Sequence, residues 1–309
     1  IIDTKREGRV QSVNFFMSNI REQVGELGAG NIPALLGLTE ARAGQTISSV
    51  KGIALFEPSK YVSEPVIQMA IEPKHPKDLP QLVETLRKLT IEDPNLIIKI
   101  DEETGETIMA GMGVLHLDVS VNLIKDAKID IITSEPLINY RETILGSSEV
   151  VMAKSPNRHN KIFMRVEPLE PEIAEMCRDG TLSEMKDKKE TTQILRDHGW
   201  EPDVAKKVMR FDSRGNVMIN GTKGVQFVDE STDSLLSGFD DLINEGGLAK
   251  EQVRNCKFTF THFVPHEDTA HRGLSQLGPA SRRACLGAFL SADPIILEPM
   301  LAIEVRVPT

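Results

Sequence analysis

The chain contains 309 residues, carries a formal net charge of −10 and has three cysteines that show no metal-ligand spacing. This length predicts two or three domains, and the scattered cysteines indicate a reducing intracellular compartment. No run of eighteen apolar residues occurs and the first residues are polar, which excludes a membrane-spanning helix and a signal peptide. The chain begins without Met, so we expect a fragment of a longer protein.

Short β segments open the chain, at residues 8–17, 28–38 and 43–50, where turn signals separate the segments. We interpret these segments as part of a β-barrel that ends near residue 56. A linker over residues 57–63 then separates the barrel from the next region.

Residues 64–136 change to alternating strand and helix patterns. A strand comes first, followed by an amphipathic helix for which Asp78 is the predicted cap. Two strands joined by a turn at 103–105 lead to a second helix and a last strand. We assign Met112, Leu115 and Leu117 to the core. The order βαββαβ predicts a ferredoxin-like domain.

From residue 137 the pattern is that of a larger α+β region. Strands are predicted at 160–169 and 253–265, and a strand or turn at 215–221. Helices are predicted at 201–212, 228–249 and 275–294, the last of them stopped by Pro294. A further strand is predicted at 298–309. The predicted fold class is therefore α+β multidomain: a partial β-barrel, a ferredoxin-like βαββαβ domain and a larger α+β domain.

Positive charge is concentrated in two segments of this acidic chain. Residues 150–166 contain Lys154, Arg158, Lys161 and Arg165, with His159 among them and no acid, whereas residues 252–291 contain Arg254, Lys257, Arg272, Arg282 and Arg283. The net negative charge excludes a protein that coats nucleic acid along its whole surface. The two segments instead predict a focused contact with a polyanion, if the fold brings them together; two separate solvated faces are the alternative.

The stretch "HEDTAHRG", residues 266–273, resembles a zinc-hydrolase signature but spaces its histidines five apart instead of four. On a helix such histidines would diverge by about 140°, and Pro265 and Gly273 indicate a loop. A loop-borne metal site that also uses His262 stays an alternative. The sequence shows no phosphate-binding glycine loop and no nucleophile elbow, so it predicts no complete active site and no catalytic residue.

Longer stretches resemble a known family. "AGNIPALLGLTEARAGQTIS", "SEPVIQMAIEPKHPKDLPQLVETLRKLTIEDPNLIIKIDEETGETIMAGMGVLHLDV", "SPNRHNKIFMRVEPLEPEI", "NGTKGVQFVDE" and "HEDTAHRGLSQLGPASRRA" are similar, in this order, to archaeal and eukaryotic translation elongation factor 2, the relative of bacterial elongation factor G. The resemblance covers essentially the whole chain.

The resemblance implies the domain boundaries: the end of a β-barrel second domain at 1–56, a linker at 57–63, a ferredoxin-like third domain at 64–136, a fourth domain at 137–292 and the start of a truncated fifth at 293–309. It also implies an N-terminal GTPase domain outside this chain, where GTP and Mg²⁺ would bind, so we expect no cofactor here. The parent protein would be a cytoplasmic, monomeric, ribosome-dependent GTPase without membrane contact.

In this family, GTP hydrolysis moves transfer RNA and messenger RNA through the ribosome by one codon, and the tip of the fourth domain enters the decoding centre of the small subunit. The resemblance places that tip in the two basic segments. The implied contact residues are Lys154, Ser155, Asn157, Arg158, His159, Asn160, Lys161, His266, Asp268, His271, Arg272 and Gly273. Cationic side chains would pair with phosphates and planar ones would stack on bases, while Gly273 would allow a tight turn.

His271 falls where the family carries diphthamide, a histidine extended by a chain that ends in a trimethylammonium and an amide. Diphthamide biosynthesis enzymes are therefore further implied partners. The sequence departs from the family pattern at Ala270, Leu274 and Ser275, and Val114 replaces a Glu. A protein without the modification, a standalone ribosome- or RNA-binding paralogue without GTPase activity, and a metal-dependent hydrolase that uses His262, His266 and His271 all stay open as alternatives.

Overall fold

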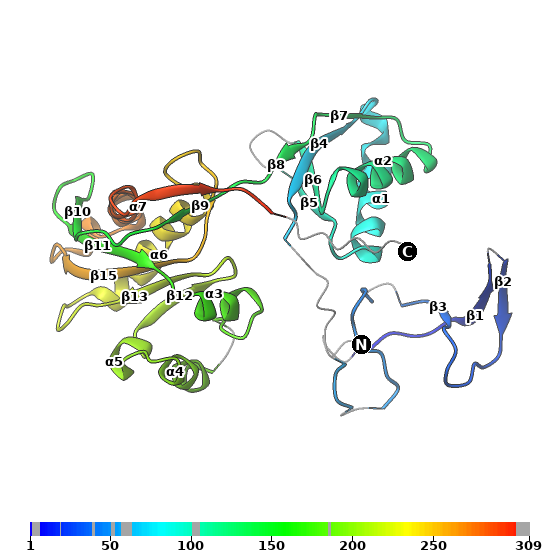
Figure 1. Ribbon diagram of the computed structural model, residues 1–309, viewed down its shortest axis with the longest axis horizontal. Coiled ribbons are helices and arrows are strands. Elements are labelled where there is room, and N and C mark those ends of the chain that lie inside the picture. The colour runs from blue at the N-terminus through cyan, green and yellow to red at the C-terminus, as the bar shows by residue number, and fades with distance from the viewer. Residues whose placement is uncertain are drawn as a thin grey trace, which may run out of the picture. The chain divides into compact units, whose positions relative to one another are not determined.

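The computed structural model describes residues 1, 7–18, 20–38, 41–50, 53–56, 64–100, 106–184 and 187–300. The chain forms two compact units, Ile1–Ile138 and Asn139–Thr309 (Figure 1). Helices and open sheets occur together in these residues, which confirms the α+β class. No described helix is long and apolar enough to cross a membrane. The predicted linker at 57–63, the turn at 103–105 and most of the strand at 298–309 lie outside the described residues.

The first unit begins with an open, antiparallel three-stranded sheet in the order β2-β1-β3. Its strands are β1 (Ser12–Met17), β2 (Ile20–Val24) and β3 (Ala34–Leu36). β1 and β3 fall within two of the predicted β segments, whereas the third prediction was wrong, because residues 43–50 contain no strand. β2 was missed because its sequence, IREQV, is largely polar and all but its last residue are exposed.

A second sheet in the same unit has the order β5-β6-β4-β7, and its strand pairs are antiparallel. Its elements are β4 (Ile67–Pro73), η1 (Pro76–Asp78), α1 (Leu79–Glu92), β5 (Ile97–Ile100), β6 (Thr107–Gly111), α2 (Val114–Asp126) and β7 (Ile131–Thr133); β8 (Leu137–Ile138) pairs with the other end of β4. This βαββαβ order and the two central strands β6 and β4 are those of the predicted ferredoxin-like domain.

The two helices bury apolar residues at helical spacing against this sheet. α1 contributes Leu82, Leu86 and Leu89, and α2 contributes Leu117 to the same core. Two residue predictions need correction here. Leu115 is 76% exposed, because it lies on the face of α2 opposite Leu117. Asp78 precedes α1 as predicted, but its side chain makes no capping hydrogen bond, because its backbone is already in the helical region.

The second unit is built on a five-stranded sheet in the order β10-β11-β15-β13-β12, in which β13 and β15 are parallel and the other pairs antiparallel. Its strands are β10 (Val151–Lys154), β11 (Lys161–Pro168), β12 (Val208–Asp212), β13 (Asn216–Asn220) and β15 (Cys256–Val264). Alternate residues of β13 enter different cores, since Met218 packs in one apolar cluster and Val217 and Ile219 in another. The sheet therefore lies between two layers of helices.

One layer contains α6 (Val228–Asn244) and α7 (Leu274–Leu290), and the other contains α3 (Pro171–Arg178), α4 (Lys188–Asp197) and α5 (Pro202–Ala205) (Figure 1). The helix predicted at 201–212 was wrong over its second half. It ends at Ala205, and residues 208–212 form the edge strand β12, because pairing with β13 overrides the local helical pattern. α3 and α4 were not predicted.

A small sheet in the order β14-β9-β16 completes the second unit. Its strands are β9 (Arg141–Ile144), β14 (Gln252–Val253) and β16 (Pro294–Leu297). Glu142 of β9 is fully buried, and its carboxylate accepts hydrogen bonds from the backbone N–H groups of Leu248, Ala249 and Glu251 at 2.7 to 3.1 Å. These charge-assisted bonds hold the loop after α6. β16 pairs with β9, so residues 294–297, assigned in sequence to a further domain, belong to this sheet.

The three cysteines are buried and unpaired. Burial raises the pKa of the Cys177, Cys256 and Cys285 thiols to about 12, so almost no nucleophilic thiolate is present near neutral pH. We expect no reaction of the folded protein with a disulfide reagent such as Ellman's reagent at pH 8, and complete reaction in urea. Rapid labelling of the folded protein would contradict this burial.

Candidate nucleic-acid interface

Two loops from distant parts of the sequence meet at one end of the second unit. The first loop, residues 155–160, joins β10 to β11, and the second, residues 265–273, joins β15 to α7. Because β11 and β15 are antiparallel neighbours with Lys161 opposite Val264, the two loops leave the sheet at the same edge. The fold therefore brings the two basic segments together, which was the condition for a focused contact. We call these two loops the tip.

Asn160 joins the two loops of the tip. It is fully buried, and its Nδ2 donates to the carbonyl of His271 at 2.7 Å and to Ser155 Oγ at 3.1 Å. Its Oδ1 accepts from the backbone N–H of His266 at 2.9 Å. Asn157 adds a longer bond from Nδ2 to the carbonyl of His271, at 3.3 Å, and its N–H donates to Gln276 Oε1 at 3.0 Å. Amide side chains of the first loop thus fix the backbone of the second.

Three imidazole rings lie against one another at the tip. The ring of His159 is 5.0 Å from that of His266 and 5.1 Å from that of His271, and the His266 and His271 rings are 4.7 Å apart and nearly perpendicular. The N–H of Asp268 donates to Nδ1 of His266 at 3.1 Å, so His266 braces the turn. Asp268 in turn begins the η2 turn (Thr269–His271), because its carboxylate accepts from the N–H of Ala270.

Backbone conformation at the tip differs from the prediction at one position. Gly273 has an ordinary φ of −63°, and a Cβ added there would meet no atom within 4 Å, so its expected role in a tight turn was wrong. The residue in the left-handed region is Arg158, with a φ of 62°. Its N–H donates to the carbonyl of Ser155 at 2.7 Å, which closes the first loop as a turn. This turn leaves the Arg158 side chain exposed.

The predicted contact residues divide by exposure. Those that are exposed are Lys154, Arg158, His159, Lys161, Asp268 and Gly273, and those that are half-buried are Asn157, His266 and His271. Ser155, Asn160 and Arg272 are buried, which differs from their predicted role as contacts, because their side chains hold the tip together from inside. Arg272 lies with its guanidinium carbon 3.9 Å from the centre of the Phe227 ring.

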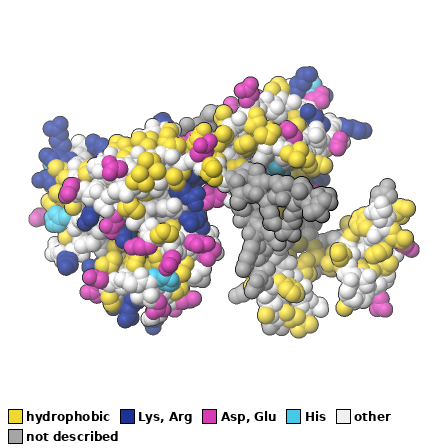
Figure 2. Space-filling view, in the orientation of Figure 1, with side chains coloured by type: hydrophobic (Ala, Val, Ile, Leu, Met, Phe, Trp, Pro, Cys, Tyr) yellow, Lys and Arg dark blue, Asp and Glu magenta, His cyan; other side chains and the backbone are white. Residues whose placement is uncertain are grey.

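Cationic side chains lie around the first loop of the tip, whereas the second loop carries the exposed acids Glu267 and Asp268. Figure 2 shows Lys and Arg side chains, with a histidine, at the end of the second unit where β10 and β11 meet. A pocket next to the first loop is lined by Lys154, Arg158 and Arg283 and by apolar residues such as Met152 and Leu290, with no acidic residue among its described lining. Arg283 is held in place because its Nη2 donates to the carbonyl of Lys154 at 2.8 Å.

Not all of the basic residues counted in the sequence belong to this surface. Lys257 is paired with Glu167 and Glu170, both at 3.0 Å, and the carboxylates of these residues raise its pKa against the lowering effect of burial. Arg282 pairs with Glu245 at 3.4 Å. These cations are neutralised by acidic neighbours, so the net positive character at the tip comes from fewer residues than the sequence suggests.

The described residues do not support the alternative of a metal site. His262 lies on β15 with its ring 5.4 Å from that of Phe163, and the third ring beside His266 and His271 is that of His159. Across the described part of the chain, no group of three or more His, Cys, Asp or Glu residues is arranged to hold a metal ion.

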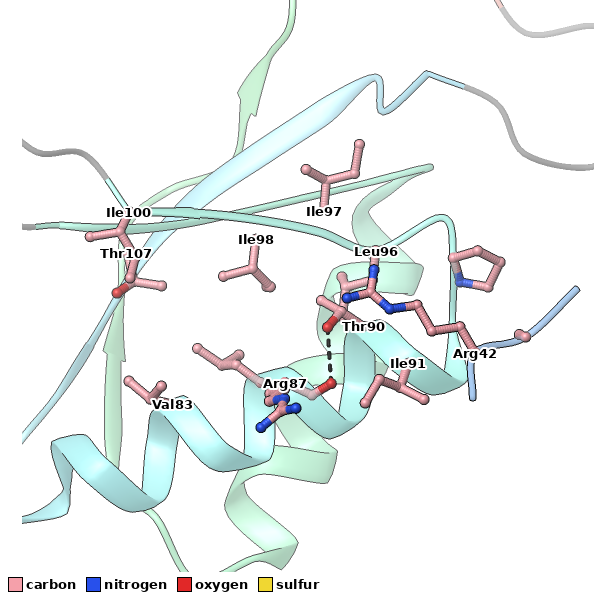
Figure 3. Close-up of a pocket in the computed structure, with 13 residues that line it drawn as sticks. Arg42, Val83, Arg87, Thr90, Ile91, Leu96, Ile97, Ile98, Ile100 and Thr107 are labelled. Carbon is pink, nitrogen blue, oxygen red and sulfur yellow. Dashed lines mark hydrogen bonds between the residues drawn. The ribbon is translucent and has the colours of Figure 1, made fainter. Parts of the chain in front are cut away.

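A pocket in the first unit is lined mostly by apolar side chains of α1, β5 and the loop between them, including Val83, Leu96 and Ile98, together with Arg42 and Arg87 (Figure 3). The described lining residues include no acid, histidine or cysteine. It therefore offers no acid and base pair, and the tip is the stronger candidate for a functional site.

Comparison with known proteins agrees with this organisation. Residues 62–135 match the family description "Elongation Factor G, domain III", and residues 180–293 match "Elongation factor G, domain IV". The second match includes the second loop of the tip, whereas the first loop lies outside both matched ranges. The ferredoxin-like domain and the α+β domain with its tip therefore define part of a translation elongation factor.

Curated relatives identify the family more closely. Over all 309 residues the chain is 72% identical to Elongation factor 2 of Cenarchaeum symbiosum (strain A), of which it covers 42%. It is 45% identical over 314 aligned residues to Elongation factor 2 of Sulfurisphaera tokodaii, covering 43% of that protein, and 44% identical over 313 to that of Metallosphaera sedula, covering 42%. The chain belongs to the elongation factor 2 family, and it spans less than half the length of these relatives.

Proposed function

We propose that this chain is the ribosome-contacting, non-GTPase part of a factor that moves transfer RNA and messenger RNA through the ribosome. The observation that carries the proposal is the meeting, at one end of the second unit, of two loops that belong to the two basic segments, fixed by Asn160 through bonds to both loops. Domain matches and relatives named Elongation factor 2 support it. On this proposal GTP and Mg²⁺ bind in a part of the protein outside these residues, and the factor acts in the cytoplasm as a monomer.

The chemistry of the tip suits contact with ribosomal RNA at the decoding centre. Lys154, Arg158 and Lys161 are exposed and can pair with phosphates, and the partly exposed rings of His159 and His271 can stack on unpaired bases. Contacts to phosphates position a protein without reading sequence, which is what a moving factor requires.

We further propose that His271 carries diphthamide. Its carbonyl is held by Asn160, and the half-buried ring lies at the end of the η2 turn, where an added chain can extend toward solvent. Diphthamide biosynthesis enzymes would then be partners of this loop. A mass spectrum of the protein from its native source tests this proposal: the diphthamide mass on the peptide containing His271 supports it, and an unmodified histidine contradicts it.

The proposed function is tested by reversing charge at the tip. In the full-length factor we expect Arg158→Glu with Lys161→Glu to slow translocation at limiting factor concentration by at least about tenfold, because two phosphate contacts become repulsive. The salt dependence of ribosome binding should also become shallower. Both are measured with the factor and ribosomes in a single-round translocation assay at several salt concentrations.

A matched control is available on α4. Lys188→Glu with Lys189→Glu makes the same change in net charge at exposed positions far from the tip in the sequence and in the fold. We expect this variant to translocate within about twofold of the wild type, in keeping with the small effects of isolated surface charges. Equal translocation rates of the two double variants would show that the tip is not the contact surface. The interpretation as a standalone paralogue would then be the better one.

A further inference from the structure

We propose that Phe227, which lies outside both basic segments, is a positioning residue that aims His271 by holding Arg272. This inference rests on the proposed function of the tip. Phe227 immediately precedes α6, whereas Arg272 follows the η2 turn, 45 positions later in the sequence. Their contact is therefore made only by the tertiary structure.

The aromatic ring is the main partner of the Arg272 guanidinium. Only 4% of the Arg272 side chain is exposed, and its guanidinium carbon lies 3.9 Å from the centre of the Phe227 ring. Its Nε and Nη1 have no hydrogen-bond partner among the described residues, and its one ion pair, Nη2 to Glu230, is long at 3.4 Å. A desolvated guanidinium above a ring face is attracted by the ring quadrupole, which gives the cation a second partner beside its long bond to Glu230.

Two sets of contacts therefore hold the chain where His271 joins Arg272. The carbonyl of His271 accepts from Asn160 and Asn157, and the next residue, Arg272, is anchored on Phe227. With the peptide between them fixed, the His271 ring stays in its place beside His159 and His266. Orientation of one contact residue by others that do not touch the ligand is how binding sites gain precision.

The backbone of Phe227 is itself unusual. Its φ is 64°, in the left-handed region, which a bulky residue rarely adopts and which persists only where the surroundings require it. Glycine would suit this backbone better, and the ring makes the cation–π contact that glycine lacks. The strained conformation therefore indicates that the aromatic side chain at this position serves a purpose beyond starting α6.

Three substitutions of Phe227 in the full-length factor distinguish the effect of its aromatic ring from the effect of its left-handed backbone. Phe227→Tyr keeps the ring face, Phe227→Leu keeps bulk without a ring, and Phe227→Gly relieves the left-handed backbone without a ring. Hydrogen exchange of the amides of His271 and Arg272, which bond to Asp268 and Thr269, reports order of the loop in the free protein. A single-round translocation assay measures whether the order of this loop matters on the ribosome.

We expect exchange of these two amides to quicken by at least about tenfold in the Leu and Gly variants and to change less than twofold in the Tyr variant. The rate of translocation should fall in the Leu and Gly variants and change little in the Tyr variant. Wild-type exchange in the Leu and Gly variants would overturn the proposal, whatever the protein does on the ribosome. Arg272→Lys, which keeps the charge but loses the planar guanidinium, should resemble the Leu variant.

The design separates this proposal from the function it rests on. If the loop loosens in the Leu variant while translocation stays normal, and the charge-reversed tip variant is slow, the positioning role is overturned and the tip function stands. If the charge-reversed variant also translocates normally, the tip function itself is overturned. Unfolding curves of each variant check that α6 and its core remain intact.

Discussion

Replacing Asn160 with Asp is expected to lower the free energy of unfolding of the second unit by about 3 kcal/mol and to loosen both loops of the tip. The exchanged atom, Nδ2, donates to the carbonyl of His271 at 2.7 Å and to Ser155 Oγ at 3.1 Å, and the side chain is fully buried. A carboxylate oxygen there cannot donate, so it would face the His271 carbonyl as a second acceptor and bring a negative charge into a dry site.

The loss of stability caused by Asn160→Asp should be smaller at low pH than at high pH. Burial raises the pKa of the introduced carboxyl above its value in the unfolded chain, so the variant is destabilised most when the carboxyl is ionised in the unfolded state. Below both pKa values the protonated carboxyl can donate to the His271 carbonyl again. We therefore expect a smaller difference from the wild type at pH 4 than at pH 8, measured by urea unfolding at each pH.

Asn244→Asp is the matched control. Asn244 is exposed at the end of α6, and its Oδ1 accepts from Arg214 Nη1 at 2.9 Å. The same isosteric change there keeps the acceptor and places a negative charge beside an arginine, so we expect a change of less than about 0.5 kcal/mol. A similar effect of the two substitutions would show that Asn160 does not hold the tip as described.

Gly238→Ala is expected to lower the free energy of unfolding by about 2 kcal/mol. A Cβ at Gly238 in α6 would collide with the backbone of α7, at the carbonyl oxygen of Gly278 and the nitrogen of Arg282. Backbone atoms cannot rotate away, so the collision should cost about 3 kcal/mol of stability, near the upper end for overpacking. Replacing Gly with Ala in a helix offsets about 1 kcal/mol of this loss through helix propensity. The measurement is the unfolding midpoint in urea or on heating.

Gly278→Ala, on the partner helix α7, is the control. Apart from its chain neighbours and the backbone of its own helix, the nearest atom to a Cβ there is Leu274 Cδ1 at 3.5 Å, which is ordinary contact. The propensity gain is partly offset because Pro279 follows and disfavours a helical backbone for a residue with a Cβ, so we expect stability to change by less than about 0.5 kcal/mol. Because α6 and α7 also carry Phe227 and Arg272 at their starts, only the Gly238 variant should disturb the tip. Stabilisation by Gly238→Ala would mean that the helices are less closely packed than described.

Local patterns predicted much of the fold. α1, α2, α6 and α7 and the strands β4, β11 and β15 lie where periodicity placed them, because each buries one face or alternates between two. Elements with weak local signals were missed, as with the polar strand β2. The edge strand β12 was interpreted as helix, since its pairing partner β13 and not its own composition decides its conformation.

The sequence predicted which segments form the candidate site, and the structure corrected which of their residues are buried. Charge located both basic segments, spacing drew attention to His266 and His271, and the resemblance to elongation factor 2 implied their place at the tip. Burial of Arg272 and Asn160 could not be predicted, since their partners lie 45 and 111 positions away, at Phe227 and His271. Gln276, Glu230 and Phe227 lie within stretches that resemble the family, but no individual role was predicted for them.

The sequence by itself determined that the chain is α+β, that one region is ferredoxin-like, and that positive charge lies in two segments of an acidic protein, because these properties depend on neighbours within a few residues or on composition. Only the tertiary structure decided which polar side chains face solvent and which join the loops. Those contacts depend on strand register and helix packing, which bring distant residues within hydrogen-bonding distance and remove some of them from water.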